Sequence, residues 1–511
     1  MKLAALMAER PGRPATAHWD PAAGDIDIAG LSADSRQVAQ GYLFAALPGA
    51  HRDGRRFIPD ALGAGAAAIL STMDITREKL GGAAAALITD PQPRRQLAWM
   101  ADRFFDAQPA IQAAVTGTNG KTSVAAFLQQ IWSAAGLKAA TMGTLGIRGP
   151  GIRRLGLERP GALTTPDPVS LHRDLAALSR AGIECLAIEA SSHGLDQFRL
   201  DGLRLRAAAF TGLGRDHIDY HGSTNAYLAC KLRLFAELVP AGGTAVINAD
   251  SPVFDAVREA CREADLKVVS YGRAATDIVL HDLTPSAGGQ RIALTLHGKP
   301  AVVDLPLVGD FQAWNALCAL GLATATGVDA GDALNALNGL RGVPGRLERV
   351  GTRRNGAAVY VDYAHTPDAL STVLNALRPH TTGALSVVFG CGGDRDTGKR
   401  APMGAAAHRL ADRAIVTDDN PRSEAPSAIR AAILPACPGA REIGDRREAV
   451  FAAVSGLGPT DILVIAGKGH EQGQIVGDAI LPFDDATVAR EAIAAADSGS
   501  ASGDASGEGA A

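Results

Sequence analysis

The chain has 511 residues, of which 47% are hydrophobic and 20% charged, with a formal net charge of -4. This length exceeds what one hydrophobic core organises and predicts three domains, while the balanced charge excludes any reason to expect nucleic acid or an anionic membrane as a partner. No N-terminal apolar run is long enough for a signal peptide or a membrane span, and the six cysteines lack metal-like pairing. We therefore expect a cytoplasmic monomer that acts on small molecules.

Residues 1–108 are predicted to form a small α/β domain. Short strand-like runs at Tyr42–Ala46 and Ala67–Leu70 are separated by turn-forming Asp, Gly and Pro. From residue 109 to 341, apolar runs alternate with helical patterns at Ile111–Val115, Cys185–Ile188, Ala207–Phe210 and Ala245–Ile247. This alternation predicts a mostly parallel sheet with helices on both faces and ligands at the carboxyl ends of its strands, and Ile278–Val303 predicts an antiparallel hairpin annex.

A break at residues 342–345 opens the third predicted domain, which extends to residue 496. Its apolar runs end in charged or glycine-rich loops and indicate a Rossmann-like fold: Ala358–Val361, Leu385–Phe389, Arg413–Val416 and Ile462–Ile465. Residues 497–511 consist of Ser, Gly, Ala, Asp and Glu without apolar periodicity, which predicts a disordered tail.

The most informative segment follows the run Ile111–Val115 and reads Gly-Thr-Asn-Gly-Lys-Thr from Gly117 to Thr122. Glycines let successive N–H groups point at phosphate oxygens, the next helix presents its positive end, Lys121 adds a charge, and the Thr122 hydroxyl can ligate Mg2+. The general pattern has a further glycine where this chain has Val115. The segment predicts a variant ATP-binding loop.

Two later segments offer metal ligands. Glu189 ends the run Cys185–Ile188, in the place of an acidic residue that reaches Mg2+ across from a phosphate loop, although a helix cap is the alternative. Two His and two Asp lie within Asp216–His221, and magnesium is favoured over zinc because no cysteine pair accompanies them. The alternative for this second segment is a solvated polar loop.

Charged side chains follow each apolar run of the third domain. Arg395, Arg422 and Glu471 are among them, together with Asp419 and Asn420. Guanidinium groups bind carboxylates bidentately, while Asp and Glu bind ammonium groups, so this set predicts an amino-acid substrate. Any one of these motifs alone is more typical of a turn or cap.

Taken together, these motifs resemble the Mur ligase family over almost the whole chain. The motifs are the loop at Gly117, Glu189–Leu195, Arg215–Gly222, Pro344–Glu348, Asp362–Ala369, Gly392–Asp396, Asp419–Arg422 and Gly467–Glu471. The resemblance implies an ATP- and Mg2+-dependent ligase of peptidoglycan synthesis, which adds 2,6-diaminopimelate to the D-Glu side chain of a UDP-muramoyl dipeptide through an acyl phosphate. The N-terminal domain would then bind the UDP-muramoyl moiety, the central domain ATP, and the C-terminal domain the amino acid.

The resemblance also implies roles for individual residues. The expected ATP contacts are Gly117, Thr118, Asn119, Gly120, Lys121, Thr122, Ser123, Asn315 and Arg346, with Asp362 and His365 close by. The expected catalytic residues are Lys121, Glu189, His217 and Lys231, and the expected metal ligands are Thr122, Glu189, His217 and Lys231. Lys231 matches a lysine that is carbamylated (N6-carboxylysine) in the family, and its alternative is a lysine on a helix surface.

Substrate contacts follow in the same way. The expected UDP-muramoyl dipeptide contacts are Ser35, within the Asp34–Arg36 turn, and His51, Arg52, Thr164, Thr165, Ser191, Gln197 and Arg199. The expected diaminopimelate contacts are Arg395, Asp419, Asn420, Pro421, Arg422, Gly467 and Glu471. Arg422 is expected to select diaminopimelate over lysine, because a guanidinium can bind the carboxylate that lysine lacks.

The chain departs from the family pattern at Leu163, Gly212, Gly214 and Gln312, where polar contacts would differ. Three alternatives stay open: a folylpolyglutamate synthetase, which lacks the N-terminal unit; a lysine-adding ligase of the same family; and a non-catalytic ATP-binding scaffold.

Overall fold

The computed structural model describes residues 1–9, 16–49, 53–159, 161, 163–214, 216–286 and 288–499. The chain divides into two compact units, one made of Met1–Val279 with Leu317–Ala336 and the other of Leu280–Ala316 with Leu337–Ala511. Each contains parallel strands joined by helices, so the α/β class predicted from the sequence is confirmed. No helix in the described ranges is both long and apolar enough to cross a bilayer.

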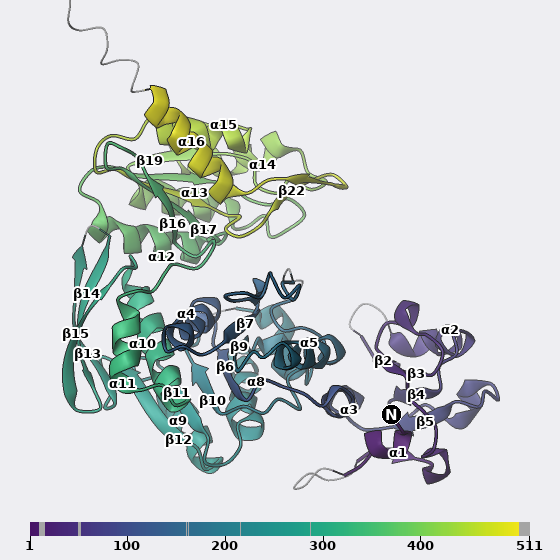
Figure 1. Ribbon diagram of the computed structural model, residues 1–511. Helices are drawn as coiled ribbons and strands as arrows, with labels where there is room; N and C mark the ends of the chain where they lie inside the picture. Colours follow the sequence, from purple (N-terminus) through teal and green to yellow (C-terminus); the bar gives the residue numbers. More distant parts are fainter. Residues whose placement is uncertain are drawn as a thin grey trace, which may run out of the picture. The chain divides into compact units, whose positions relative to one another are not determined.

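The first unit begins with a five-stranded sheet in the order β1-β5-β4-β3-β2, and Figure 1 labels β2, β3, β4 and β5. Its strands are β1 (His18–Trp19), β2 (Gly30–Ser32), β3 (Tyr42–Ala45), β4 (Ala68–Ser71) and β5 (Ala86–Thr89), and only β1 pairs antiparallel. Its helical segments are α1 (Leu3–Leu6), η1 (Pro21–Ala23), η2 (Ser35–Gln37), η3 (Gly54–Phe57), α2 (Ile58–Gly63), η4 (Arg77–Leu80) and α3 (Pro93–Phe105). Both strands predicted in this region are present as β3 and β4.

The central sheet of the first unit contains every apolar run predicted there as a strand. Seven of its strands follow the order β12-β11-β10-β6-β9-β7-β8 and are parallel except for the β7–β8 pair. They are β6 (Ile111–Thr116), β7 (Ala139–Gly143), β8 (Gly146–Arg148), β9 (Cys185–Glu189), β10 (Ala207–Phe210), β11 (Thr244–Asn248) and β12 (Lys267–Gly272). Because β6, β9 and β10 are adjacent and parallel, the segments that follow them emerge at one edge of the sheet.

Helices connect these strands, as expected for parallel pairing. They are α4 (Lys121–Ala134), α5 (Pro168–Arg180), α6 (Ser192–Asp196), α7 (Ile218–His221), α8 (Thr224–Arg233), the π-helical segment η5 (Leu234–Leu238) and α9 (Phe254–Glu263). Pro at the first position and the Asp167 carboxylate, which accepts from Val169 and Ser170 N–H groups, define the start of α5.

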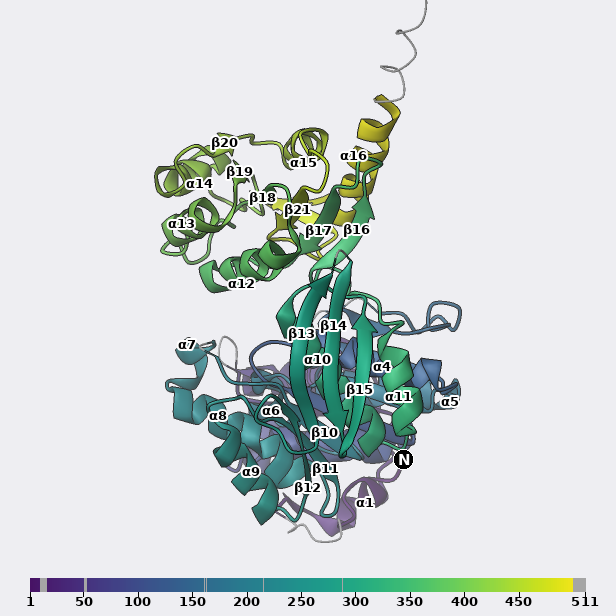
Figure 2. The same ribbon diagram turned by 90° about the vertical axis from the view of Figure 1, so that its left-hand side faces the viewer.

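The second unit begins with the predicted hairpin annex, which consists of three long strands, β13 (Ile278–Ser286), β14 (Gly289–Leu296) and β15 (Lys299–Leu305). Figure 2 shows them side by side, and β14 and β15 pair antiparallel. Helix α10 (Asp310–Ala325) follows, and its first seven residues belong to this unit. Helix α11 (Ala330–Leu337) comes next along the chain.

The remaining sheet of the second unit has the order β16-β17-β21-β18-β19-β20, with β17, β21, β18 and β19 parallel. Its strands are β16 (Glu348–Thr352), β17 (Ala358–Asp362), β18 (Leu385–Phe389), β19 (Arg413–Val416), β20 (Arg441–Glu442) and β21 (Ile462–Ala466), and β22 (Gly473–Val476) with β23 (Ala479–Pro482) forms a separate hairpin. Its helical segments are α12 (Pro367–Leu377), η6 (Arg378–His380), α13 (Arg400–Leu410), α14 (Pro426–Ile433), η7 (Leu434–Ala436), α15 (Arg446–Ser455) and α16 (Asp485–Gly499).

Side-chain alternation along β21 explains why this sheet is covered on both faces. Val464 and Ala466 belong to one buried cluster, whereas Leu463 and Ile465 belong to another. Successive strand residues point to opposite faces, so a continuous apolar run requires a core on each side. This arrangement is the one that the sequence predicted for the third domain.

One boundary differs from the prediction. Helix α16 continues through Asp497 and Ser498, which the sequence assigned to a disordered tail. The Asp497 carboxylate accepts from the Arg353 guanidinium at 3.2 Å and from the Arg354 N–H at 3.0 Å, and these contacts hold the last turn. The rest of the predicted tail, residues 500–511, lies outside the described residues.

Candidate active site

The loop between β6 and α4 has the backbone that a phosphate site requires. Gly117 and Gly120 have φ of 141° and 87°, which L side chains rarely adopt. A Cβ at Gly117 would lie 1.9 Å from the Thr211 hydroxyl, so this position also lacks room for a side chain. Val115 is a buried residue of β6 that pairs with β9 and β10, which explains why no glycine is needed there. The 14-residue helix α4 then starts at Lys121 with its N-terminal N–H groups at the loop.

Two lysines converge on this loop. The Lys121 ammonium donates to the carbonyls of Gly117 and Thr118, each at 2.9 Å. The Lys231 ammonium, from α8, also donates to the Gly117 carbonyl at 2.9 Å. Burial, with the nearby Lys121 charge, lowers the pKa of Lys231 to about 7. Lys231 is only 1% exposed, so it is not the surface lysine of the alternative interpretation. The Lys121 ammonium beside a helix N-terminus favours an anionic ligand.

Glu189 lies beside the same loop. It ends β9, is 2% exposed, and its Oε2 accepts from the Thr122 hydroxyl at 2.9 Å. Thr144, which the sequence did not single out, donates to Glu189 through its N–H at 2.8 Å and its hydroxyl at 3.1 Å. Glu189 is therefore not a helix cap. A carboxylate and a hydroxyl at the end of a phosphate loop are donors that suit a hard cation such as Mg2+. In the described part of the chain, no group of three or more His, Cys, Asp or Glu is placed to hold a metal, so these oxygens fit a cation shared with phosphate rather than an all-protein site.

His217 has a different environment. It has a left-handed backbone, φ 52°, at the start of α7, and its ring lies 4.8 Å from the His193 ring, centroid to centroid. Tyr220 lies 4.1 Å from His193 by the same measure, and the sequence gave neither residue a role. Among described residues, no hydrogen bond or ion pair joins His217 to Glu189 or to Lys231. Arg215 lies outside the described residues.

The five residues expected to hold the muramoyl peptide form one cluster next to Glu189. The Thr165 hydroxyl donates to the Glu189 carbonyl at 2.8 Å and lies 3.0 Å from the Ser191 hydroxyl. Arg199 donates to the Thr165 carbonyl and to the Gln197 side-chain oxygen, each at 2.7 Å. Thr164 reaches the cluster through the Thr144 hydroxyl at 3.1 Å. The sequence places these residues up to 35 positions apart, and the segment between β8 and α5 meets the segment after β9 to bring them together.

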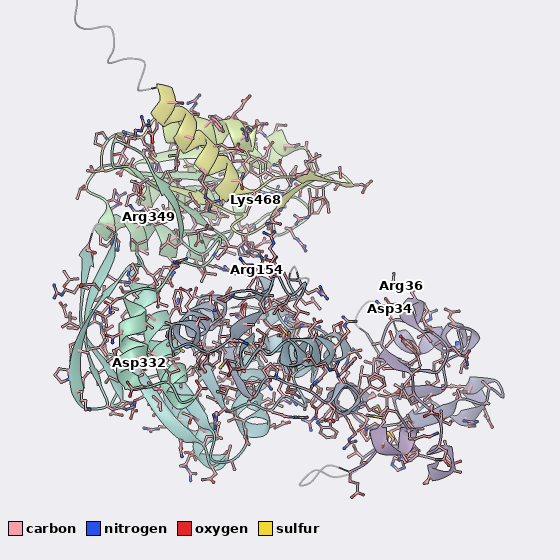
Figure 3. All side chains as sticks on the ribbon, in the orientation of Figure 1. Asp34, Arg36, Arg154, Asp332, Arg349 and Lys468 are labelled. Atoms are coloured by element: carbon pink, nitrogen blue, oxygen red, sulfur yellow. The ribbon has the colours of Figure 1, made fainter. Side chains whose placement is uncertain are left out.

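The N-terminal turn expected to bind uridine is well ordered by its own residues. The Asp34 carboxylate caps η2 and binds the Arg36 guanidinium at 2.9 and 2.7 Å, and the two side chains lie together at the surface (Figure 3). Ser35 between them is half-buried. The second expected loop, with Ala50, His51 and Arg52, lies outside the described residues.

In the second unit, loops that follow β19 and β21 share a closed polar network. The buried Lys468 ammonium, labelled in Figure 3, donates to the Asn420 side-chain oxygen at 2.9 Å and to Glu471 at 3.1 Å. Asn420 in turn donates to Glu471 at 2.9 Å. Gly467 has φ of 118°, and a Cβ there would lie 2.6 Å from the Asp419 carboxylate. The strand ends thus bring together four expected amino-acid contacts, and the sequence predicted no role for Lys468, although the Gly467–Glu471 motif includes it.

Arg422 is held by the hairpin β22–β23. Its backbone is left-handed, φ 52°, and its N–H donates to the Ile475 carbonyl at 3.0 Å while its own carbonyl accepts from Gly477 at 2.8 Å. The Arg422 guanidinium donates to the Gly393 carbonyl at 2.7 Å. Pro421 is buried immediately before it, and Arg395 is exposed. The sequence did not predict this hairpin.

The remaining expected nucleotide contacts also belong to the second unit. The Arg346 guanidinium lies 4.8 Å from the centroid of the Tyr363 ring, a cation–π contact. The Asp362 carboxylate accepts from the N–H groups of Leu347 and Ala364 at 2.6 and 2.7 Å, and burial raises its pKa to about 6. Asn315 is buried and donates to Gln312 at 3.0 Å.

A phosphate loop that joins a parallel strand to a helix, with an acidic strand end beside its threonine, defines an ATP-using enzyme of the α/β class. Three models match in succession: "Mur ligase family, catalytic domain" at residues 27–105, "Mur ligase middle domain" at 115–323, and "Mur ligase, glutamate ligase domain" at 345–469. The chain belongs to the Mur ligase family, which makes it an ATP-dependent ligase with the three-domain plan predicted from its sequence.

Individual relatives support the same family assignment. A protein of Caulobacter vibrioides is 52% identical over 479 residues, covering 93% of this chain and 98% of its own, and one of Brucella melitensis biotype 1 is 50% identical over 473 residues, covering 93% and 95%. Both are named UDP-N-acetylmuramoyl-L-alanyl-D-glutamate–2,6-diaminopimelate ligase. A solved structure of a ligase with the same name is 33% identical, with a TM-score of 0.71, and covers 97% of this chain and 99% of its own. The match to residues 27–105 argues against a folylpolyglutamate synthetase, which was expected to lack this region.

Proposed function

We propose that the chain joins meso-2,6-diaminopimelate to the D-Glu side-chain carboxylate of UDP-N-acetylmuramoyl-L-alanyl-D-glutamate at the expense of ATP, a cytoplasmic step of peptidoglycan synthesis. The chain matches relatives named for this reaction over almost their whole length. The observation on which the proposal depends most is the convergence of Lys121 and Lys231 on the Gly117 carbonyl, with Glu189 bound to Thr122 nearby. All six cysteines are free, which suits a reducing compartment.

The chemistry assigns the phosphate loop a clear task. A carboxylate is a poor acyl donor, and transfer of the ATP γ-phosphoryl group to it makes an acyl phosphate with phosphate as the leaving group. Lys121 and the N-terminal N–H groups of α4 would neutralise charge on the transferred group, and these groups are already fixed before the reaction. The amine of the incoming amino acid then displaces phosphate and forms the amide.

Thr122 and Glu189 would hold Mg2+, since their oxygens are hard donors beside the loop. When bound, the cation neutralises phosphate charge. We further propose that Lys231 is carbamylated, because its amine is buried next to the phosphate loop and a carbamate would place a carboxylate there. The assignment of His217 to the metal depends on the family resemblance alone.

For the muramoyl peptide we propose the cluster of Thr164, Thr165, Ser191, Gln197 and Arg199, with Ser35, His51 and Arg52 on the uridine side. Arg199 supplies a cation next to Thr165 in this cluster, which suits the carboxylates of the dipeptide. For the amino acid we propose Arg395, Asp419, Asn420, Pro421, Arg422, Gly467 and Glu471. Arg422, fixed by the hairpin, is the selective group, because diaminopimelate has a second carboxylate and lysine does not.

The test is a product assay. Purified protein is incubated with ATP, Mg2+, the UDP-muramoyl dipeptide and equal amounts of meso-diaminopimelate and L-lysine, and products are identified by mass. We expect phosphate release that requires all substrates and a tripeptide product containing diaminopimelate. Equal or better incorporation of lysine would support the lysine-adding alternative, and ATP binding without turnover would support the scaffold.

A further inference from the structure

Phe198 lies between Gln197 and Arg199, two of the proposed peptide contacts, and its backbone is left-handed with φ of 55°. Two guanidinium groups lie close to its ring. The Arg95 Cζ is 4.5 Å from the ring centroid, and the Arg233 Cζ is 4.2 Å from it. Each is a cation–π contact. The left-handed backbone costs free energy for a bulky residue, so these contacts must hold the ring in place.

Asp201 makes this arrangement of two cations stable. It is fully buried, and both of its carboxylate oxygens accept from Arg233 at 2.6 Å. The Arg95 guanidinium lies 3.1 Å from the same carboxylate. Glu237 pairs with both arginines as well, at 3.1 Å from the Arg233 Nε. Two positive and two negative groups therefore balance around one aromatic ring. We call Arg95, Phe198, Asp201 and Arg233 the arginine–phenylalanine cluster.

The cluster connects parts of the first unit that have different tasks. Arg233 also donates to the Leu195 carbonyl at 2.7 Å, so it holds the whole loop that contains Gln197 and Arg199. Lys231 precedes Arg233 by two residues on α8, and residues two apart on an α-helix point about 200° apart. One side of α8 therefore reaches the phosphate loop through Lys231, and the other holds the peptide-binding loop through Arg233.

Arg95 adds a third connection. It lies in the first turn of α3, which follows the N-terminal sheet in the chain. Its contacts with Phe198, Asp201 and Glu237 join the end of the region proposed for UDP-muramoyl binding to the peptide-binding loop. The nucleotide end and the glutamyl end of one substrate would thus be bound by regions that meet at this cluster.

We propose that Arg95, Phe198, Asp201 and Arg233 are positioning residues that hold Gln197 and Arg199 at a fixed place relative to the phosphate loop. They act through the peptide-binding loop and do not touch the substrate. The inference rests on the proposed function, because it assigns the glutamyl carboxylate to this loop. Gln197 and Arg199 are proposed contacts of the dipeptide, so displacement of their loop weakens binding of this one substrate without removing a reacting group, and the readout is KM for the dipeptide.

The first test is Phe198→Gly. Glycine adopts a positive φ at little cost, so this change removes the ring and leaves the backbone favourable. We expect KM for the UDP-muramoyl dipeptide to rise about tenfold, with KM for ATP within about twofold of wild type and the melting temperature nearly unchanged. Phe198→Tyr restores an aromatic ring and should restore KM for the dipeptide.

The second test is Arg95→Met, which keeps the length of the side chain and removes its charge. It should raise the same KM, and the double variant with Phe198→Gly should be less impaired than the two single effects combined, because both remove one contact. Arg262→Met on α9 is the matched control, since Arg262 is exposed and pairs with Glu259 on its own helix. It should leave all three KM values as in wild type.

The outcomes separate the two proposals. A wild-type protein that releases no phosphate with all substrates present refutes the proposed function itself. Activity in wild type together with an unchanged dipeptide KM in Phe198→Gly and Arg95→Met overturns the positioning role. Equal increases in KM for ATP, amino acid and dipeptide, or a loss of melting temperature that Phe198→Tyr does not correct, overturn it in favour of a general role in stability.

Discussion

The phosphate loop of the first unit and the loops after β19 and β21 in the second unit differ in the partners of their buried lysines. At the phosphate loop, Lys121 and Lys231 approach the same carbonyl, and burial lowers the pKa of Lys231 to about 7. In the second unit, Lys468 is just as buried but is paired with Glu471 and Asn420. The phosphate loop, with Lys121 at the N-terminus of a helix, is suited to a polyanion, whereas the paired ammonium, carboxylate and amide groups around Lys468 are suited to a zwitterion.

The largest expected effect is at the phosphate loop. Lys121→Met removes the charge that would neutralise the transferred phosphoryl group, so we expect kcat for phosphate release to fall about 1,000-fold. Steady-state phosphate release measures it. Lys267→Met, an exposed lysine on β12, is the control and should be fully active. A fall of less than tenfold in Lys121→Met would show that the Lys121 charge has no catalytic role.

The second-largest expected effect distinguishes the role of Lys231 from that of Lys121. Lys231→Ala should lower kcat at least 100-fold, because it removes the proposed carbamate, and short carboxylic acids at high concentration should restore part of the activity. Lys121→Met should gain nothing from the same acids. Rescue of both variants, or of neither, would contradict the distinct roles of the two lysines.

In the second unit, Arg422→Ala should lower kcat/KM for diaminopimelate about 100-fold while KM for ATP stays unchanged, because the second carboxylate loses its cation. Competition with L-lysine measures the selectivity, which should fall by the same factor. Arg441→Ala, an exposed arginine on β20, is the control. If selectivity survives in Arg422→Ala, the zwitterion is recognised by the balanced network alone.

The smallest effect is on stability and comes from Asp362. Burial raises its pKa to about 6, above the value of 3.8 for an exposed carboxyl. Between pH 3.8 and about pH 6 the folded state therefore holds a proton that the unfolded state has released. The free energy of unfolding should therefore fall as pH rises from about 4 to about 6, by at most about 3 kcal/mol, and level off above. Denaturant unfolding of wild type and Asp362→Asn measures it: the variant should lose this slope, whereas Asp478→Asn, exposed in the hairpin β22–β23, should keep it.

Much of this molecule could be predicted from local patterns. The runs at Ile111, Cys185, Ala207 and Leu385 are strands because continuous apolar stretches bounded by turn residues have few other solutions. The loop at Gly117 was recognisable because glycine, lysine and threonine occur there at fixed spacing. The family followed from the order of such motifs along the chain and is confirmed by the comparisons.

Other features depend on contacts between distant residues. Thr144 binds Glu189 only because β7 and β9 are neighbours in the sheet, and nothing near Thr144 in the sequence marks it. The hairpin that fixes Arg422 is half-buried along most of β22 and exposed along β23, so neither strand is a continuous buried apolar run. Helix α16 extends past its predicted end because Arg353, 144 positions earlier, binds Asp497.

The sequence alone determined the α/β class, the phosphate loop and the family, because each depends on residue type and short spacing. Only the tertiary structure decided that Lys231 is buried beside Gly117, that Glu189 binds Thr122, and that Arg95 and Arg233 contact the Phe198 ring. The physical reason is that burial and charge pairing are properties of side chains brought together across a fold, and no local stretch of the chain contains both partners.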